Sequence, residues 1–337
     1  MKKQLLNISL MVVLSTIAVH VEAQDPNFSQ YFSSPLCVNP ANTGFFYGSQ
    51  RIVGNYRRQW WGAGEPFTTA TISFDAKIPM GAEGNDKLGI GVMALNDKAA
   101  GGLMKSNYFS LSGAYHKALD DEGHTSLGLG FQASYVNKIV DLTNASFSNQ
   151  FTSGGFDLSL PTGENYLAGS TAHFDVSTGL LFKHDDENKN YYFGVSYFHV
   201  TKPKESIIND NNTRVAPRLS AQAGFSTSIG ENRIFLSAMF QNQAKVNMYA
   251  LGGAFAYALP SNNNDVSWYI GGWYGNTNLY PYTGLQFNNF QFGITYDIIT
   301  TQLKTASQKN GSFELSMNYI IFGHKGNSGD KPMAPQF

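Results

Sequence analysis

Residues 124–138, HTSLGLGFQASYVNK, carry the clearest structural pattern in the chain. Leu127, Leu129, Phe131, Ala133 and Tyr135 alternate here with serine, glycine and glutamine. Every second side chain of a β-strand lies on the same face of its sheet, so the pattern predicts a strand with one apolar face and one polar or glycine face. Each face must therefore meet a different environment.

The same two-residue period recurs along most of the chain. About fourteen such segments are expected, starting near Arg51, Phe67, Lys87, Ser106, His124, Ala172, Asn190, Thr213, Asn232, Val246, Asp265, Leu279, Phe290 and Ser312. Both sheets of a sandwich would place an apolar face in a shared core, and a propeller would show blade-length repeats, which the sequence lacks. An even number of strands, apolar outside and polar inside, predicts an all-β fold: a closed transmembrane antiparallel β-barrel of about fourteen strands.

Composition agrees with this class. Charged residues make up 14% of the chain, against about 25% in ordinary soluble proteins, and aromatic residues also make up 14%. The formal net charge is −1, so no basic field is present to attract nucleic acid. The mean hydropathy of −0.23 excludes a bundle of membrane helices.

The connections between the segments alternate in length. Those on one side, such as DDEG, GEN and NN, are short and turn-forming, whereas those on the other side include DKAAGGLMK, KPKESIINDNN and the long segment 139–171, and this alternation holds through most of the chain. Bacterial barrels have short periplasmic turns and long outer loops. We also expect interfacial aromatic girdles from the aromatic clusters near strand ends: Trp60 and Trp61, Tyr191 and Tyr192, Trp268 and Tyr269, Trp273 and Tyr274, and Tyr280 and Tyr282.

The first 24 residues have the form of a secretory signal peptide. MKK is a basic start, and LLNISLMVVLSTIAV is an apolar run that is too short and too interrupted to span a membrane. We therefore divide the chain into a cleaved signal at 1–24, an N-terminal segment at 25–50, an outer-membrane barrel at 51–322 and a periplasmic tail at 323–337. Cys37 is the single cysteine, so no internal disulfide can form.

The N-terminal segment is too aromatic to be a solvated leader. Its apolar residues, Phe28, Tyr31, Phe32, Leu36 and Phe45, must be buried somewhere. We expect either a plug that packs in the lumen or a segment that docks on the periplasmic rim as a partner site.

A charged network is expected in the lumen. One face of the first strand carries Arg51, Asn55, Arg57 and Gln59. Val53 is the one side chain on this face that is compatible with lipid. The candidate partners are Asp75 on the second strand, Asp297 on the penultimate strand and Glu314 on the last. We interpret these residues, and Arg218 on a later strand, as an ion-pair scaffold that fills the barrel and not as a substrate site.

One predicted outer loop offers a different surface. Residues 141–166 are rich in Ser, Thr, Asn and Gly, and carry the apolar residues Phe147, Phe151, Phe156, Leu158 and Leu160. Such a loop can pair its edge with an incoming β-domain, or it can fold over the pore as a lid. The residues alone leave both possibilities open.

No catalytic or metal-binding motif is found. The histidines form no HExxH pattern, and neither a G-x-S-x-G elbow nor a P-loop is present. His173 and Asp175 share one strand face, but in a chain this rich in serine a hydrolase dyad there is better explained by chance. We expect no enzyme activity, no cofactor and no metal site.

The N-terminal segment and first strand resemble the PorP/SprF family, outer-membrane proteins that accompany the type IX secretion system of Bacteroidetes. The family pattern is QDPxFSQYxxxPLxxNPAxxG followed by YRxQW. The matching residues are Gln24, Asp25, Pro26, Phe28, Ser29, Gln30, Tyr31, Pro35, Leu36, Asn39, Pro40, Ala41, Gly44, Tyr56, Arg57, Gln59 and Trp60. Near the other end, Tyr296 and Asp297 followed by GSFELSMNY are similar to the family's closing hairpin.

The resemblance implies a non-enzymatic barrel that helps to export or retain large surface proteins, including adhesins used in gliding motility. Its implied partners are outer-membrane lipid, a secreted adhesin or its type B C-terminal domain, and periplasmic components of the secretion apparatus. The alternative from the residues themselves is a passive diffusion channel for small solutes, and an outer-membrane hydrolase is a distant third.

Overall fold

The chain folds into a closed antiparallel barrel of fourteen strands. The computed structural model describes residues 24–60, 65–81, 85–143, 145–164, 167–186, 189–207, 213–260, 265–301 and 311–322. The predicted signal peptide, apart from Gln24, and the predicted tail at 323–337 lie outside the described residues. Among the described residues, no helix is long and apolar enough to cross a membrane.

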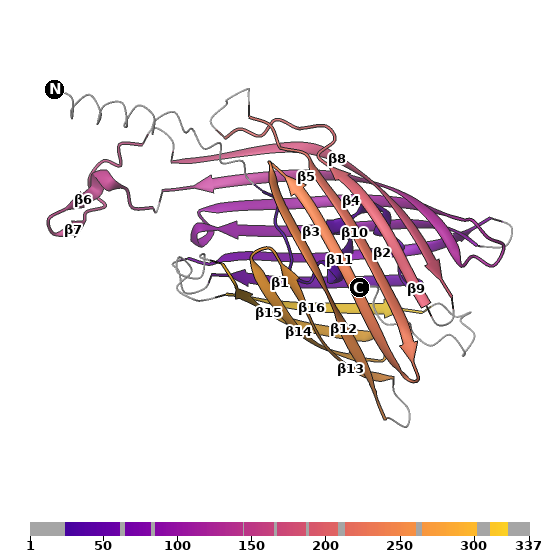
Figure 1. The fold of residues 1–337 in the computed structure, drawn as a ribbon. Coiled ribbons are helices and arrows are strands. Elements are labelled where there is room, and N and C mark those ends of the chain that lie inside the picture. Colours follow the sequence, from indigo (N-terminus) through magenta and orange to yellow (C-terminus); the bar gives the residue numbers. More distant parts are fainter. Residues whose placement is uncertain are drawn as a thin grey trace, which may run out of the picture.

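Successive strands pair with one another, and the first pairs with the last (Figure 1). The barrel strands are β1 (Gln50–Gln59), β2 (Phe67–Met80), β3 (Asp86–Ala99), β4 (Met104–Ala118), β5 (Thr125–Asp141), β8 (Ala168–Asp185), β9 (Lys189–Phe198), β10 (Arg218–Ile229), β11 (Asn232–Gln243), β12 (Val246–Leu259), β13 (Val266–Gly275), β14 (Asn278–Phe287), β15 (Phe290–Ile299) and β16 (Ser312–Ile321). Closure leaves no strand edge in the barrel unpaired.

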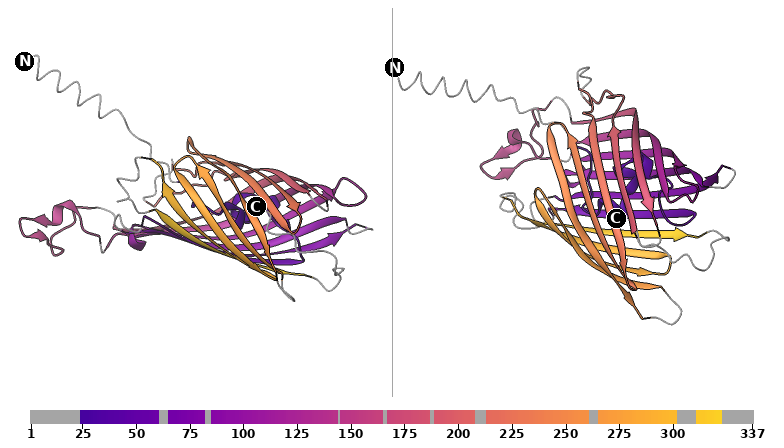
Figure 2. Two further views of the ribbon diagram at one scale, coloured as in Figure 1. Left: turned by 60° about the horizontal axis from the view of Figure 1, so that its bottom comes forward. Right: turned by 45° about the vertical axis from the view of Figure 1, so that its right-hand side comes forward.

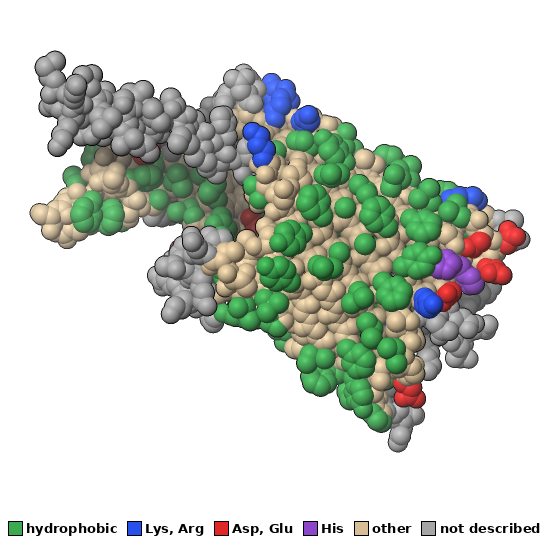
Figure 3. Space-filling model, viewed as in Figure 1, with side chains coloured by type: hydrophobic (Ala, Val, Ile, Leu, Met, Phe, Trp, Pro, Cys, Tyr) green, Lys and Arg blue, Asp and Glu red, His purple; other side chains and the backbone are tan. Residues whose placement is uncertain are grey.

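The predicted fold class is confirmed, and the two-residue period is its cause. In β5, Leu129 and Phe131 are exposed on the outer face, whereas Gln132 and Ser134 are buried in the lumen. The outer face of the strands is covered by hydrophobic side chains, and charged side chains gather toward the two ends (Figure 3). This band is the surface that a membrane requires.

The two ends of the barrel differ in the length of their connections. Between β10 and β11 only residues 230–231 intervene, whereas residues 199–217 connect β9 to β10 and residues 142–167 connect β5 to β8. We call the short-turn end the inner end and the long-loop end the outer end, because bacterial barrels place long loops outside.

The expectation of aromatic girdles is wrong for part of the selected residues, because several of them face the lumen. Trp268 and Tyr274 are exposed on the outer face, but their neighbours Tyr269 and Trp273 are each 1% exposed and face the lumen. Tyr192 and Tyr282 are likewise buried. Adjacent residues of a strand point to opposite faces, so only one aromatic of a consecutive pair can reach the membrane interface.

Residues 25–49 lie inside the barrel, and we call them the plug. They contain three short helical turns, η1 (Tyr31–Ser33), α2 (Pro35–Val38) and η2 (Pro40–Asn42). This segment is drawn in indigo. It lies behind the front strands in Figure 1 and is enclosed by the barrel strands in both views of Figure 2. Of the two sites expected for the aromatic segment, the structure therefore places it in the lumen.

Candidate functional site: the lumen plug and the two mouths

The plug runs from the outer end of the barrel to the inner end. Asp25 donates its backbone N–H to Gln243 at the outer end of β11, and Ser49 donates to the carbonyl of Ile321 at the inner end of β16. The described chain therefore enters the lumen at the outer mouth and joins β1 at the inner mouth.

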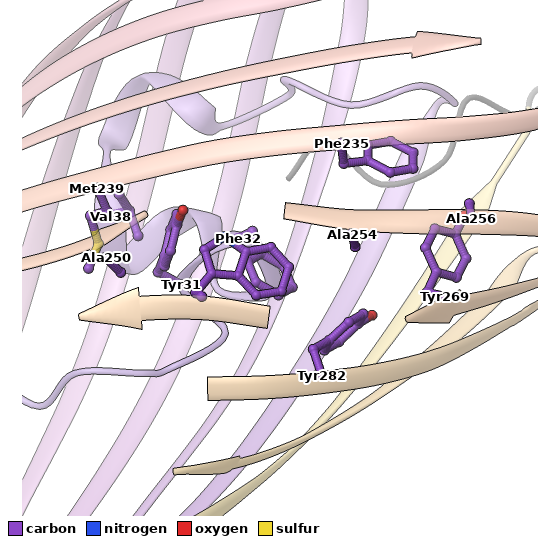
Figure 4. Packing of buried hydrophobic residues seen from close by; sticks show 11 residues of the cluster. Tyr31, Phe32, Val38, Phe235, Met239, Ala250, Ala254, Ala256, Tyr269 and Tyr282 are labelled. Atoms are coloured by element: carbon purple, nitrogen blue, oxygen red, sulfur yellow. The ribbon is translucent and has the colours of Figure 1, made fainter. Parts of the chain in front are cut away.

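An aromatic cluster holds the middle of the plug. Phe32 packs at 4.5 Å from the ring of Trp273 and at 5.5 Å from that of Tyr282, and Tyr31 shares a 2.7 Å hydrogen bond with the hydroxyl of Ser237. Figure 4 shows Tyr31 and Phe32 from the plug beside Tyr282 on the barrel wall. Burial of a side chain of this size stabilises by about 2–3 kcal/mol, so this cluster contributes much of the plug's attachment.

Glycines in the wall allow the plug backbone to approach closely. A Cβ at Gly130 of β5 would collide with the backbone of Pro40 and Ala41, and one at Gly89 of β3 would collide with the carbonyl of Thr43. Asn39 caps the same plug turn: its side chain accepts from the N–H of Ala41 at 2.9 Å. The NPA part of the motif is therefore shaped to fit glycine positions in the wall.

The charged network lies at the contact between the plug and the seam where the barrel closes. Arg57 of β1 lies 2.6 Å from a carboxylate oxygen of Asp297 and 3.8 Å from one of Glu314. Glu314 accepts the backbone N–H groups of Ser29 at 2.7 Å and Gln30 at 3.1 Å. Both carboxylates are 0% exposed, so the network is sealed from solvent by the plug.

A second ion pair faces the lumen nearer its inner end. Arg51 forms two hydrogen bonds with Asp75, at 2.9 and 2.8 Å, and also donates to the carbonyl of Asn42. Asp75 in turn accepts the N–H of Gly44 at 2.8 Å. The arginines of β1 thus bind the barrel wall and the plug together.

The structure places the residues of the predicted set as follows. Phe28, Gln30, Tyr31, Asn39 and Pro40 are buried in the plug, and Arg51, Arg57, Asp297 and Glu314 form the two ion-pair groups. The side-chain amide of Gln59 is oriented so that both its oxygen and its nitrogen meet suitable partners. In this orientation its oxygen accepts a hydrogen bond from the guanidinium of Arg57 at 3.0 Å. Trp60, directly after β1, packs edge-on against Phe67.

Tyr56 does not belong to the lumen network. Its side chain is 38% exposed on the outer face and lies beside Phe313. The strand parity gives the reason, since Tyr56 has the opposite parity to Arg57.

A third charged cluster lies at the outer mouth, and of its members only Arg218 was assigned to the ion-pair scaffold from the sequence. His199, directly after β9, lies 2.7 Å from a carboxylate oxygen of Asp25 and 2.8 Å from one of Asp175. Arg218 lies 3.1 Å from Asp25. Asp175 thus pairs with His199 and not with His173, whose ring nitrogen is 3.9 Å from Glu205. The pairing of Asp25 with His199 joins residues 174 positions apart, which no local pattern can indicate.

This cluster makes the attachment of the outer plug end depend on pH. Burial alone would lower the pKa of His199, but hydrogen bonds to Asp175 and Asp25 outweigh it and raise the pKa to about 9 from its usual 6.5. Burial would raise the pKa of Asp25, but Arg218 and His199 together lower it. The stabilisation from His199 is therefore complete below about pH 6.5 and is lost as the pH rises through about 9; that from Asp25 is lost only in strong acid.

We expect the folded barrel to lose about 2–3 kcal/mol of stability between pH 6.5 and pH 9.5 through His199. The measurement is urea unfolding in lipid vesicles at both pH values, for the wild type and for His199→Gln. Other groups titrate in the same range, so the prediction concerns the difference between the two proteins. Equal pH dependence in both would exclude His199 as the cause. Asp25 and Asp175 bind the ring of His199, His173 interacts with it electrostatically, and Arg218 pairs with Asp25 beside it.

The predicted loop forms a small hairpin at the outer end. Its strands are β6 (Phe151–Thr152) and β7 (Gly155–Phe156), and the rings of Phe151 and Phe156 are 5.1 Å apart. Figures 1 and 2 show the hairpin projecting away from the barrel instead of covering its mouth, so the lid expectation is not supported. Phe151, Phe156, Leu158 and Leu160 are exposed, and Phe147 is half-buried.

A different connection contacts the barrel wall at the outer mouth. Residue Glu205, in the connection between β9 and β10, lies 2.6 Å from the amine of Lys138 on β5. Lys204 and Arg214 of the same connection form an isolated β-bridge. The connection between β9 and β10 is therefore tied to the barrel wall at the outer mouth.

Comparison with known proteins gives one family and several distant barrels. Residues 20–319 match the model of a family described as type IX secretion system membrane protein PorP/SprF. A search of curated proteins finds no match.

Solved structures resemble the barrel at low identity. The toluene transporter TbuX of Ralstonia pickettii has 9% identity and a TM-score of 0.47, and the match covers 85% of this chain and 91% of that one. A FadL homologue of Pseudomonas aeruginosa has 12% identity and a TM-score of 0.49, with 88% and 94% covered. The toluene transporter TodX of Pseudomonas putida has 8% identity and a TM-score of 0.46, with 88% and 97% covered.

Proposed function

Because the chain belongs to the PorP/SprF family of type IX secretion membrane proteins, we propose that it is a non-enzymatic outer-membrane barrel that assists export and cell-surface anchoring of secreted cargo. The cargo proposed is a large adhesin of the gliding type, held through a type B C-terminal domain. Membership of this family implies contact with secretion components, cargo and membrane lipid.

The observation that supports anchoring best is the β6–β7 hairpin. Phe151, Phe156 and Leu158 are 57–65% exposed on a segment that projects beyond the outer end of the barrel. An exposed apolar group on a strand edge can pair with the edge strand of an incoming β-domain and bury its side chains there. The proposed cargo-binding surface is this hairpin with Leu160 and Phe147 at its base.

The state of the lumen also favours a protein partner over small solutes. A diffusion channel needs a hydrated bore lined with opposing charges. In the described part of the chain, the arginines and carboxylates at the centre of the lumen are instead paired with one another and with the plug. The passive channel remains the alternative function and predicts solute flux without a bound partner.

We expect Phe151→Ser combined with Phe156→Ser to abolish recovery of a secreted surface protein with the barrel. The test is affinity purification of the tagged barrel in mild detergent from its native host, followed by mass spectrometry. Leu119→Ser is the matched control, because Leu119 is 56% exposed in a turn at the inner end. The serines remove the apolar area that would be buried, which is worth about 2 kcal/mol for each large side chain.

Two results would contradict anchoring. In one, the wild-type barrel is recovered alone and passes small sugars in liposomes, which would support the channel. In the other, a surface protein is recovered equally with the double variant, which would move the binding surface away from the hairpin.

A further inference from the structure

Four basic side chains gather on the lumen wall near the inner end. They are Lys77 of β2, Lys87 of β3, Lys183 of β8 and Arg233 of β11. Each lies two positions from a residue that is buried toward the lumen: Asp75, Gly89, Leu181 and Phe235, respectively. The strand period therefore directs all four into the lumen, and all four remain partly exposed there.

The four cations share one carboxylate, that of Asp185. Lys183 lies 2.9 Å from it, and Lys77, Lys87 and Arg233 interact with it electrostatically. Lys77 and Lys87 each also experience repulsion from Lys183. Among the described residues, these four positive charges and the one carboxylate that they share leave a surplus of three.

Contacts with the plug explain only part of this cluster. Lys77 donates to the carbonyl of Phe46 at 2.6 Å, and the amine of Lys183 lies 5.6 Å from the ring centre of Phe45. Arg233 donates to the hydroxyl of Ser228. Within the described ranges, no hydrogen bond or ion pair is found for the amine of Lys87.

Within the described ranges, the other carboxylates at the inner end have partners of their own or face water. Asp75 is paired with Arg51, and Asp86 is paired with Lys117 on the outward side. Asp120, Asp121 and Glu122 lie in the exposed turn between β4 and β5, where water screens their charge.

We propose that this basic cluster of Lys77, Lys87, Lys183 and Arg233 binds a phosphate-type anion. Three of its four cations are lysines, which bind phosphate as point charges, whereas carboxylate recognition favours the planar fork of arginine. A phosphate group also carries its charge on one compact centre. An acidic peptide would spread carboxylates along the chain, toward the acidic turn at the rim.

The phosphate can come from a soluble compound of the periplasm or from a lipid headgroup at the inner rim. Both sources offer the same oxygens to the same side chains. The proposal rests on the inner end of the barrel and is independent of the hairpin and of any cargo.

The test is titration of the full-length barrel, in non-ionic detergent at low ionic strength, with pyrophosphate, measured by isothermal calorimetry. Lys87→Gln is expected to weaken binding by about tenfold, since it removes a partly buried charge from the site. Asp185→Asn is expected to strengthen binding by a similar factor of about ten, because it removes the competing carboxylate. Lys98→Gln is the control, since Lys98 is exposed near the outer end of β3 and should bind as the wild type does.

The source is tested with vesicles that contain phosphatidic acid or only phosphatidylcholine. Binding of phosphatidic acid with the same dependence on Lys87 indicates a lipid, and binding of pyrophosphate alone indicates a soluble compound; each supports the site. Binding that is unchanged in both Lys87→Gln and Asp185→Asn would overturn it. A hexaglutamate peptide that bound more tightly than pyrophosphate would replace the phosphate class with an acidic segment of a protein.

Discussion

Replacing Arg57 with methionine is expected to lower the free energy of unfolding of the barrel by about 3–5 kcal/mol. Arg57 is buried between Asp297 and Glu314, so its loss leaves two carboxylates in the lumen without their cation. Breaking a buried pair by removing one partner typically has an effect of this size. The loss should also loosen the plug, because these carboxylates bind Ser29 and Gln30.

Urea unfolding in lipid vesicles, followed by tryptophan fluorescence, measures this change. Arg58→Met is the matched control, because Arg58 has the opposite strand parity and should have an effect of about 0.5 kcal/mol or less. Combining Arg57→Met with Asp297→Asn and Glu314→Gln should recover a large part of the loss, since no unpaired charge then remains. Equal effects of Arg57→Met and Arg58→Met would show that the lumen network does not stabilise the fold.

Deleting residues 26–46 is expected to open the lumen, so that a barrel blocked by its plug becomes one that conducts small solutes. These residues occupy the lumen of a fourteen-stranded barrel, whose inward side chains include Arg51, Asp75, Gln222 and several serines. Barrels of sixteen to eighteen strands hold an aqueous channel, whereas about eight strands leave room only for side chains, so an emptied barrel of intermediate size should admit water and small solutes.

Swelling of liposomes in small sugars measures the effect. The full-length barrel should give the rate of protein-free liposomes, and the deletion variant should give a rate of the order of an open porin. Barrel formation is checked by the shift in gel migration on heating, and a deletion of residues 147–160 serves as a control that retains the plug. Rapid flux through the full-length protein would show that the plug does not close the lumen.

The barrel was predictable because its evidence is local and repeated. The two-residue period in β5 returns in most of the strands, and few folds bury only one face of each strand. The partners of Arg57 could also be chosen from the sequence, since Glu314 lies on β16, which pairs with β1, and Asp297 lies on β15, the next strand beyond it. Adjacent strands in a closed barrel leave little freedom in such an assignment.

Strand boundaries were less predictable. The segment expected near Thr213 begins at Arg218, directly after Pro217, which lacks a backbone N–H for the ladder. The segment expected near Ala172 begins at Ala168, because small polar residues continue the pairing with β5 without an apolar period. Strand boundaries of this kind depend on the neighbouring strands with which the segment pairs, and not on its own sequence alone.

The sequence did not predict that the plug runs from the outer mouth to the inner mouth, or which charged residues meet at each mouth. Asp25 is placed by His199, Arg218 and Gln243, which are more than 170 positions away. The basic cluster of Lys77, Lys87 and Lys183 forms only once the strand register is fixed. A lysine near a turn cannot be assigned to a charged cluster from the sequence, because its neighbours on the adjacent strands are not known.

The central claim is that the barrel acts on a secreted protein held at its outer end. Photo-crosslinking in living cells of the native host tests it most directly, with a photoreactive phenylalanine at Phe156 and, as the control, at Leu119. The proposal predicts a covalent adduct between residue 156 and a large secreted surface protein, and none at residue 119. Absence of an adduct at 156 in cells that display the adhesin, or equal adducts at both positions, would contradict it.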